Sequence, residues 1–290
     1  MVNVGEKKAT PRTAVAFGSV HLGKEIMGLL TQGVAKGDVW ASSRIAGIMA
    51  AKKTSELIPL THPVRLDSVQ VHLAPWGEER IVVFVEARAT DRTGLEMEAM
   101  VGASMALLNM YDMTKALGKG IRLEGIRLLL KTGGKSGDWL GEKVERGVVE
   151  KLAISKAKGT PKEPRDEAVI KRGFGVETDA HGGDWHRQVS LLGTDSIKKM
   201  RDKGLKVDFG SFAENIATSG IVLYELPVGS LLFFESGALL EVTQIGKECH
   251  TRCAVFHTAG DCVMPREGIF GRVLNGGPVK SGDRLLAVRP

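Results

Sequence analysis

The residues best suited to chemistry lie within positions 94–138. Asp112 and Lys115 are three positions apart in a segment of helical pattern, so they share one face of the expected helix. Further on, Lys131 and Lys135 belong to a glycine-rich run typical of loops that bind anions through backbone N–H groups and ammonium ions. This combination predicts proton transfer on an anionic substrate. The alternative is an exposed ion pair worth ~0.3 kcal/mol beside a solvated turn.

Two glutamates precede the same helix. Residues 95–97 are predicted to end a strand, which would place Glu96 and Glu98 on one face by the two-residue period. Residues 99–117 lack proline and repeat Met, Ala and Leu at helical spacing, so a buried helix is predicted there. The glutamates are therefore either site residues or charges on a strand surface.

A histidine stands in a stiff loop upstream. His62 lies between Pro59 and Pro63, which restrict the backbone on both sides. Lys52 and Lys53 end the helix before it, where the helix dipole favours cations. A lysine crowded by other lysines has a lowered pKa and could act as a general base or acid, which is the prediction for the site lysines of this half, including the one beside Asp112.

The third chemical cluster lies near the C-terminus. Cys249, His250, Cys253, His257 and Cys262 fall within one short segment. A zinc site is one interpretation, although paired C-x₂-C knuckles are absent. Small buried cysteines are a second, and a reactive or metal-ligating thiolate is a third, because a neighbouring arginine favours the ionised sulfur.

Composition limits the class of protein. The 290 residues suit two domains, and 43% hydrophobic and 26% charged residues are ordinary for a globular protein. A net charge of +6 suits an anionic small molecule, while 5% aromatics disfavour a surface that stacks nucleic-acid bases. No apolar run approaches the ~20 residues of a membrane span, and no signal-peptide core is visible. Three cysteines give no disulfide framework, so a cytoplasmic protein without membrane or nucleic-acid partners is expected.

The elements that must position the first cluster can be read in order. Residues 1–17 are predicted to form a polar extended arm and 20–30 a helix. A second helix over 39–54 is capped by Asp38, with Ile45, Ile48 and Met49 facing inward. Strands at 66–74 and 80–89 form a hairpin, and a further strand covers 121–130. The expected fold is α+β, with helices on one face of an antiparallel sheet.

The second half has a different pattern. The polar segment 141–146 is taken as the boundary, which gives domains at 1–141 and 147–290. Strands are predicted from the β-type runs at 148–154, 221–223, 230–234, 239–245 and 284–288, and a helix capped by Thr194 over 194–203. This half is predicted to be mostly β, as a closed barrel.

Three segments of the first half carry a family resemblance. They are SRIAGIMAAKKTSELIPLTHP, TGLEMEAMVGASMALLNMYDMTKAL and LLLKTGGKSGDW. They resemble cyclic pyranopterin monophosphate synthase, the MoaC family of molybdenum-cofactor biosynthesis. The resemblance implies a ferredoxin-like α+β fold and a hexamer built as a trimer of dimers, with active sites between subunits. It implies conversion of a cyclised dihydroguanosine triphosphate to cyclic pyranopterin monophosphate and pyrophosphate, with no cofactor.

The resemblance also assigns residues. Asp112 matches the active-site aspartate. The catalytic and substrate lysines would be Lys36, Lys52, Lys115 and Lys131, and the substrate-binding positions Leu60, Thr61, His62, Met97 and Glu98, to which we add Glu96 and Lys135. One position departs from the family, which usually has cysteine where this chain has Thr61. Threonine still donates a hydrogen bond but forms no thiolate.

The second half resembles the MOSC domain found at the C-terminus of molybdenum-cofactor sulfurases. The matching segments are GVETDAHGGDWHRQVSLL, DFGSFAENI, LPVGS, TQIGKECHTRC and GDCVMPREGIFGRVLNGGPVKSGD. The resemblance implies a β-barrel with a cysteine that carries sulfur or ligates molybdenum, first Cys253, then Cys249 and Cys262. It also implies a cofactor pocket lined by His186, Arg187 and Asn215, with arginine suited to the phosphate.

Together these observations predict a bifunctional enzyme. The first half would be the synthase, and the MOSC half would bind or sulfurate molybdenum cofactor, with a sulfur donor or a molybdoenzyme as partner. The alternative is a non-catalytic cofactor carrier in which the first half keeps only binding. Thr61 is the feature that favours this alternative.

Overall fold

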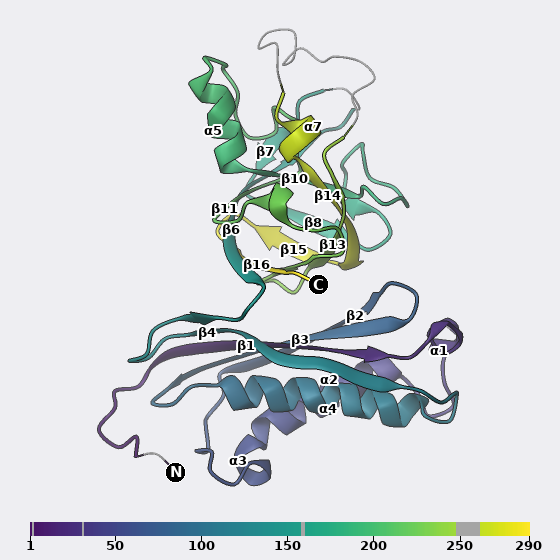
Figure 1. The fold of residues 1–290 in the computed structure, drawn as a ribbon, viewed down its shortest axis with the longest axis vertical. Coiled ribbons are helices and arrows are strands. Elements are labelled where there is room, and N and C mark those ends of the chain that lie inside the picture. The colour runs from purple at the N-terminus through teal and green to yellow at the C-terminus, as the bar shows by residue number, and fades with distance from the viewer. Residues whose placement is uncertain (2, 31, 158–159, 248–261) are drawn as a thin grey trace. The chain divides into compact units, whose positions relative to one another are not determined.

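The computed structural model describes residues 1, 3–30, 32–157, 160–247 and 262–290 (Figure 1). The chain forms two compact units, Met1–Glu142 and Lys143–Pro290, called here the N-terminal unit and the barrel unit. Each has its own hydrophobic core. Each unit is therefore described by itself.

The N-terminal unit is an antiparallel sheet with helices on one face (Figure 1). Its strands are β1 (Thr10–His21), β2 (Ser68–Trp76), β3 (Arg80–Asp91), β4 (Arg122–Thr132) and β5 (Trp139–Leu140). Its helices are α1 (Lys24–Leu30), α2 (Val39–Lys52), α3 (Thr54–Leu57) and α4 (Glu96–Thr114). The order β2-β3-β1-β4, with α2 and α4 as the crossing helices, is the predicted ferredoxin-like arrangement.

Small residues let α2 and α4 approach closely. A Cβ atom on Gly47 would lie 2.9 Å from the carbonyl oxygen of Gly102, so neither a larger residue nor a sliding of the helices fits there. The buried positions of α2 are accordingly small, including Ser43, Ala50 and Ala51. This contact fixes which end of α2 meets which end of α4.

Several sequence expectations for this unit were wrong. Residues 10–21 form the central strand rather than an arm and the start of a helix, because β1 pairs on both sides and its sequence lacks polar alternation. The long helix begins at Glu96, so Glu96 and Glu98 occupy its first turn instead of a strand, where the helix dipole favours acids. Ile45 and Met49 are 57% and 54% exposed, because α2 packs through its small residues.

Other expectations were confirmed. The Asp38 carboxylate caps α2 by accepting hydrogen bonds from the backbone N–H groups of Trp40 and Ala41. Ile48 packs against the core, as predicted. The β2–β3 hairpin and β4 also lie where the alternating pattern placed them, within a few residues.

The barrel unit is a closed ring of β-strands, as predicted. In the described chain, seven strands follow the order β6-β16-β12-β13-β14-β10-β11, and β11 pairs back onto β6. The strands of the unit are β6 (Val144–Ile154), β7 (Glu163–Arg165), β8 (Glu167–Lys171), β9 (Gly175–Val176), β10 (Val189–Gly193), β11 (Ile216–Ser219), β12 (Leu231–Phe234), β13 (Leu239–Ile245), β14 (Ile269–Asn275), β15 (Gly277–Lys280) and β16 (Arg284–Val288). Closure gives each of these seven strands a partner on both sides, whereas the small sheet β15-β8-β9 stays open.

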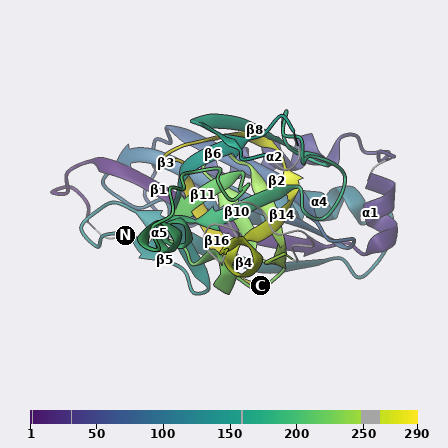
Figure 2. The ribbon, with the colours of Figure 1, turned by 90° about the horizontal axis from the view of Figure 1, so that it is seen from above.

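Short helices decorate the ring. They are α5 (Thr194–Asp202), η1 (Leu223–Glu225) and α7 (Met264–Glu267). Figure 2, in which α5 is seen end-on, and Figure 1 both place this helix outside the barrel. Inside, the core is built from large aliphatic and aromatic side chains, including Leu191 and Phe234.

The barrel differs from expectation in three details. Residues 144–146, predicted as part of the linker, already belong to β6. The predicted strand at 221–223 is replaced by η1, and the strand lies earlier, at β11. Gly193 rather than Thr194 occupies the cap position of α5, and no side chain caps it.

Candidate functional sites

The first candidate site surrounds Asp112 at the C-terminal end of α4. Lys36 Nζ lies 2.8 Å from Asp112 Oδ2, and Lys115 Nζ lies 2.6 Å from Oδ1. Lys36 reaches this point from the turn before α2 and also donates to the Asp112 backbone carbonyl. Hydrogen bonds from Lys115 and Lys36 lower the pKa of Asp112 to about 2. Asp112 is therefore a fixed anion that aligns two ammonium groups.

This geometry changes the expected role of the lysines. The hydrogen bond to Asp112 raises the pKa of Lys115 above its ordinary value. The prediction that neighbouring lysines lower the pKa of a site lysine was wrong for Lys115 within one subunit, because the nearest charged group is the Asp112 carboxylate. Both lysines are substantially exposed and present protons toward solvent. They are arranged as proton donors and anion binders.

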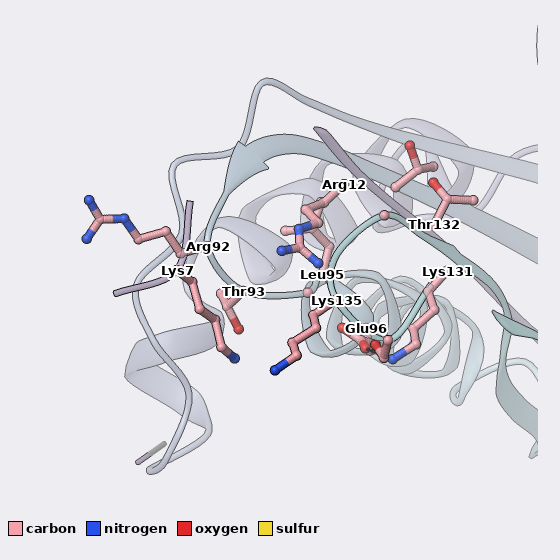
Figure 3. A pocket seen from close by; sticks show the side chains of 13 residues that line it. Lys7, Arg12, Arg92, Thr93, Leu95, Glu96, Lys131, Thr132 and Lys135 are labelled. Atoms are coloured by element: carbon pink, nitrogen blue, oxygen red, sulfur yellow. Dashed lines mark hydrogen bonds and ion pairs between the residues drawn. The ribbon is translucent and has the colours of Figure 1, made fainter. Parts of the chain in front are cut away.

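The second candidate site lies at the opposite end of α4. Lys131 Nζ on β4 is 2.9 Å from Glu96 Oε1 in the first helical turn. A hollow of about 320 Å³ surrounds this pair. Its lining side chains are predominantly cationic and polar, with Lys7, Arg12, Arg92 and Lys135 among them. In Figure 3, Lys7 and Lys135 extend toward the same space, with Arg12 above them, whereas Arg92 extends away. This is a cationic pocket.

Sequence reasoning missed the arginine of this pocket. Arg12 leaves the start of β1, which had been taken as an arm, and its Nε donates to the backbone carbonyl of Asp91 at 3.3 Å. Gly134 has φ +88°, and a Cβ there would collide with the Arg12 guanidinium. The glycine-rich loop thus serves to seat Arg12. In the sequence, the only sign of this contact is a basic residue at the start of an apolar run together with a glycine-rich loop that could accommodate it.

Glu98 is held differently from Glu96. Its residue exposure is only 4%, and no ion-pair partner is found for it among the described residues. Burial, together with the nearby charges of Glu96 and Asp91, raises its pKa, against the effect of a backbone hydrogen bond. Met97, between the two glutamates, is partly exposed. A buried carboxyl with a raised pKa is suited to proton exchange.

The loop after α3 carries the remaining predicted positions. Leu60 is 73% exposed, and His62 is partly buried. The Thr61 hydroxyl donates to the backbone carbonyl of Ile58 at 2.9 Å, so it stabilises the turn. Lys52, exposed, ends α2 just before this loop.

The predicted residues therefore form two groups rather than one. Lys36, Lys115 and Asp112 meet at one end of α4, while Lys131 and Glu96 meet at the other. Asp112 follows Glu96 by sixteen residues of α4, which corresponds to ~24 Å along the axis. One subunit does not bring Lys131 to Asp112.

The barrel unit contains a third candidate site. A hollow of about 580 Å³ is lined by His186, Arg187, Gln244, Ile245, Gly246, Lys247 and Pro265, without a carboxylate among them. The Arg187 guanidinium carbon lies 4.6 Å from the ring centre of Trp185 and 5.6 Å from that of Phe270. These cation–π contacts hold a planar cation at the pocket.

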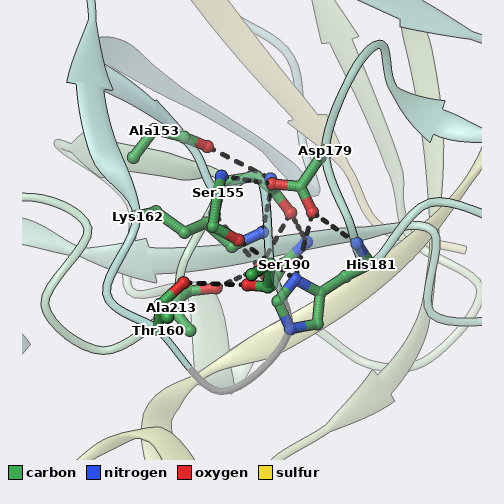
Figure 4. A network of polar contacts seen from close by, with 10 residues as sticks. Ala153, Ser155, Thr160, Lys162, Asp179, His181, Ser190 and Ala213 are labelled. Carbon is green, nitrogen blue, oxygen red and sulfur yellow. Dashed lines mark hydrogen bonds and ion pairs between the residues drawn. The ribbon is translucent and has the colours of Figure 1, made fainter.

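Asn215 lies in the interior instead of the pocket wall. Its side chain accepts from the Ser190 hydroxyl at 3.0 Å and donates to Asp179 at 3.1 Å. Asp179 also accepts from buried Lys162 at 2.6 Å and from the backbone N–H of His181 at 2.9 Å (Figure 4). Burial alone would raise the Asp179 pKa, but the hydrogen bonds, chiefly from Lys162, lower it overall. Asn215 thus anchors the loop that carries His186 and Arg187.

The cysteine predictions are divided. Cys249 and Cys253 lie outside the described residues, as do His250 and His257. Cys262 is buried at 8% exposure in a cluster with Val263, Met264 and Phe270. In the part of the chain that the structure describes, no group of three or more His, Cys, Asp and Glu residues could hold a metal ion.

Comparison with known proteins adds to this geometry. The MoaC family model matches residues 1–134, and the MOSC domain model matches 177–286. A cyclic pyranopterin monophosphate synthase of Novosphingobium aromaticivorans is 51% identical over 140 residues, covering 48% of this chain and 88% of the relative. The chain belongs to the MoaC family. Asp112, its two lysines and all lining residues of the cationic pocket except Lys135 and Ser136 lie within the part matched by the MoaC model.

Solved structures share only a distant likeness. The YUAD protein of Bacillus subtilis has a TM-score of 0.44 at 21% identity, covering 50% of this chain and 97% of that one. YiiM from Geobacillus stearothermophilus has 0.38 at 17%, covering 49% and 75%. At these scores the likeness adds nothing to the description of this MoaC family member. Within the described residues, the helices are too short or too polar for any of them to traverse a bilayer.

Proposed function

We propose that the N-terminal unit is a cyclic pyranopterin monophosphate synthase. It would act as a lyase on a cyclised dihydroguanosine triphosphate and release pyrophosphate. The 51% identity to a synthase of that name carries the proposal. The retained charges support it, because Asp112 holds two lysines within 2.8 Å in this chain.

The two charged groups suit different parts of such a substrate. The cationic pocket, with Lys131, Lys135 and Arg12, matches a triphosphate of about four negative charges. Lys36 and Lys115, aligned by Asp112, can give and return protons during ring rearrangement. Glu98 is a second proton-exchanging group because it is buried without a cationic partner among described residues. This half requires no cofactor.

A complete site would need two subunits. The ~24 Å between the two groups exceeds what side chains of one subunit can bridge. Placing α4 of a second copy so that its Asp112 end faces the Lys131 end of the first would join them. Exposed Ile45 and Met49 give α2 an apolar surface suited to such contacts. A hexamer, as a trimer of dimers, is the assembly we propose.

The barrel unit would bind molybdenum cofactor. Arg187 and Lys247 line a pocket with no carboxylate among its described lining residues, which fits the phosphate of the cofactor. The bound group would supply the molybdenum and its sulfur ligands, while this chain would supply the cationic side chains that bind its phosphate. Cys253 would carry sulfur or ligate molybdenum, with Cys249 and Cys262 as the other candidates. A sulfur donor or a molybdoenzyme is the corresponding partner.

The test is pyrophosphate release by the full chain given the cyclic triphosphate. Asp112→Asn should lower the rate more than about 100-fold, the usual range for a group that directs proton transfer. Glu78→Gln is the matched control, because it removes an exposed ion pair with Lys24 at 2.6 Å that involves neither Asp112 nor its lysines. Circular dichroism should show both variants folded. An active Asp112→Asn protein would refute the assigned role.

The second candidate function is a non-catalytic carrier. The departure at Thr61, whose hydroxyl is engaged in its own turn, is the observation that favours it. A folded, oligomeric wild-type protein that releases no pyrophosphate would support the carrier.

A further inference from the structure

His186 is held in one orientation at the edge of the barrel pocket. Its Nε2 lies 3.0 Å from Gln244 Oε1, and its backbone carbonyl accepts a hydrogen bond from the Thr243 hydroxyl. The Trp185 ring lies edge-on to the imidazole with 6.0 Å between ring centres. Backbone and ring are therefore both fixed by neighbours on β13 and on the same loop.

The chemistry of Gln244 decides the tautomer of His186. Gln244 Nε2 donates to the carbonyl of Gly246 at 2.7 Å, and a carbonyl can only accept. The amide oxygen must therefore face His186, and it too can only accept. It follows that His186 Nε2 carries the proton in the neutral ring, which leaves the lone pair on Nδ1. Within the described residues no hydrogen bond to that nitrogen is found, and Nδ1 is the ring atom that can accept from a ligand.

The neighbouring Arg187 presents the opposite chemistry. Its guanidinium is held against Trp185 and Phe270, and its Nε is buried without a hydrogen-bond partner among the described residues. Lys247 adds a second cation to the pocket wall. The described lining thus offers N–H donors with positive charge and, directly beside them, the acceptor nitrogen of His186.

We propose that this pocket selects an oxyanion that carries its own hydrogen-bond donor. Arg187 would take the charged oxygens, and His186 Nδ1 would accept the donor, whether a P–OH group or an N–H or O–H group beside it. His186 is then a specificity-determining residue, and Gln244 is the residue that positions it. This inference rests on the proposed ligand-binding function of the barrel unit, and it adds the ligand chemistry.

A comparison of hydrogen phosphate with sulfate tests the contact with Arg187 separately from the contact with His186. At about pH 8.5 imidazole is neutral, and both ions are tetrahedral dianions that differ by one O–H group. Sulfate has no hydrogen to donate, so its oxygen would meet the lone pair of His186 Nδ1 with another lone pair. An acceptor left without a donor weakens binding, so hydrogen phosphate should bind about tenfold more tightly than sulfate.

The full-length protein can report on this pocket separately from the N-terminal unit. Trp185 is the only tryptophan after residue 142, and the chain has 4 in all. Fluorotryptophan labelling, with the Trp185 signal assigned by Trp185→Phe, gives a fluorine NMR probe next to Arg187. Titration with each ion then yields dissociation constants for this site.

Variants assign the selectivity. His186→Phe should weaken hydrogen phosphate binding to the level of sulfate and leave sulfate unchanged. Gln244→Met should lower the ratio, because the ring is no longer held by the amide oxygen. Arg187→Gln should abolish binding of both ions.

The outcomes are distinct. Equal affinity of the wild-type protein for the two ions, or a preference that survives His186→Phe, would overturn the inference while leaving the pocket in place. Absence of any Trp185 response to either ion would overturn the proposed ligand pocket itself, and the inference with it.

Discussion

Two buried carboxylates, one in each unit, are held in opposite ways. Glu98 in the N-terminal unit is 4% exposed and has a raised pKa, chiefly from burial. Asp179 in the barrel unit is 5% exposed, yet hydrogen bonds from Lys162 and its neighbours hold its pKa below the ordinary value. Burial alone therefore does not set the protonation of a carboxyl group. The groups that donate to it decide the direction.

The two carboxyl groups therefore differ in how many hydrogen bonds hold them in place. Asp179 is anchored on both oxygens and ties together the loop that presents His186 and Arg187. Glu98 is met by a backbone hydrogen bond but by no cation among the described residues. Its neighbour Glu96, paired with Lys131, lines a hollow. The barrel unit thus uses a buried ion pair to position residues, whereas in the N-terminal unit the charged pair beside Glu98 lines an open hollow.

The largest effect should follow from breaking the barrel network. Asp179→Asn leaves Lys162 charged and buried, so the barrel unit should lose about 3–5 kcal/mol of unfolding free energy. Hydrogen exchange read by mass spectrometry resolves the two units and should show the loss only after residue 142. Asp166→Asn is the matched control, because Asp166 accepts from Lys151 at the same 2.6 Å but is 83% exposed. A loss below about 1 kcal/mol in Asp179→Asn would contradict a structural role.

The split site of the N-terminal unit predicts complementation between subunits. Lys131→Ala and Asp112→Asn should each be inactive alone. Coexpressed with different tags and purified together, they should recover roughly a quarter of wild-type activity, because about one shared site in four receives both intact halves. Mixing two preparations of Asp112→Asn alone gives the baseline. No recovery in mixed oligomers would place both groups in the site of a single subunit.

Glu98 should respond to pH in the opposite sense to a paired carboxylate. Its folded pKa is raised, so the folded state is favoured at low pH and loses stability as pH rises through that pKa. Glu98→Gln should therefore stabilise the N-terminal unit at neutral pH by on the order of 1 kcal/mol. The gain should vanish below the ordinary glutamic acid value of 4.5. Melting temperatures measured across pH test this, and a gain that is independent of pH would contradict it.

The smallest change is expected at the position that departs from the family. Thr61 donates to Ile58 within its own turn, so Thr61→Cys should alter the unfolding free energy by less than about 1 kcal/mol. Pyrophosphate release should also remain within about twofold. A large rise in turnover would instead show that the missing thiol limits this enzyme.

Local signals predicted much of this molecule. The Asp112–Lys115 pair followed from helical spacing, and the cap at Asp38 from its side-chain chemistry. β1 was missed because a central strand, paired on both sides, lacks the alternation that marks a half-buried strand. The contact between Lys36 and Asp112 joins segments that are 76 residues apart in the sequence. Local patterns do not predict such a contact, and Lys36 was assigned to the site from the family resemblance.

The remaining errors share a cause. Arg12 was overlooked because its place depends on where Gly134 turns, which no single segment encodes. Asn215 was assigned to a pocket wall because its motif adjoins one, but its side chain joins two strands and a loop through Ser190, Ala153 and Asp179. The positions of both side chains depend on contacts between segments that are distant in the sequence, and neither local pattern nor composition predicts these contacts.

The close crossing of α2 and α4 has an evolutionary consequence. With Gly47 packed against Gly102, α2 and α4 are held in one register, and this register fixes where Lys36, just before α2, meets Asp112 on α4. A single inserted or deleted codon inside either helix would rotate one charged group away from its counterpart. Length variation in this lineage should therefore gather in turns such as 77–79, while the helices change only by substitution.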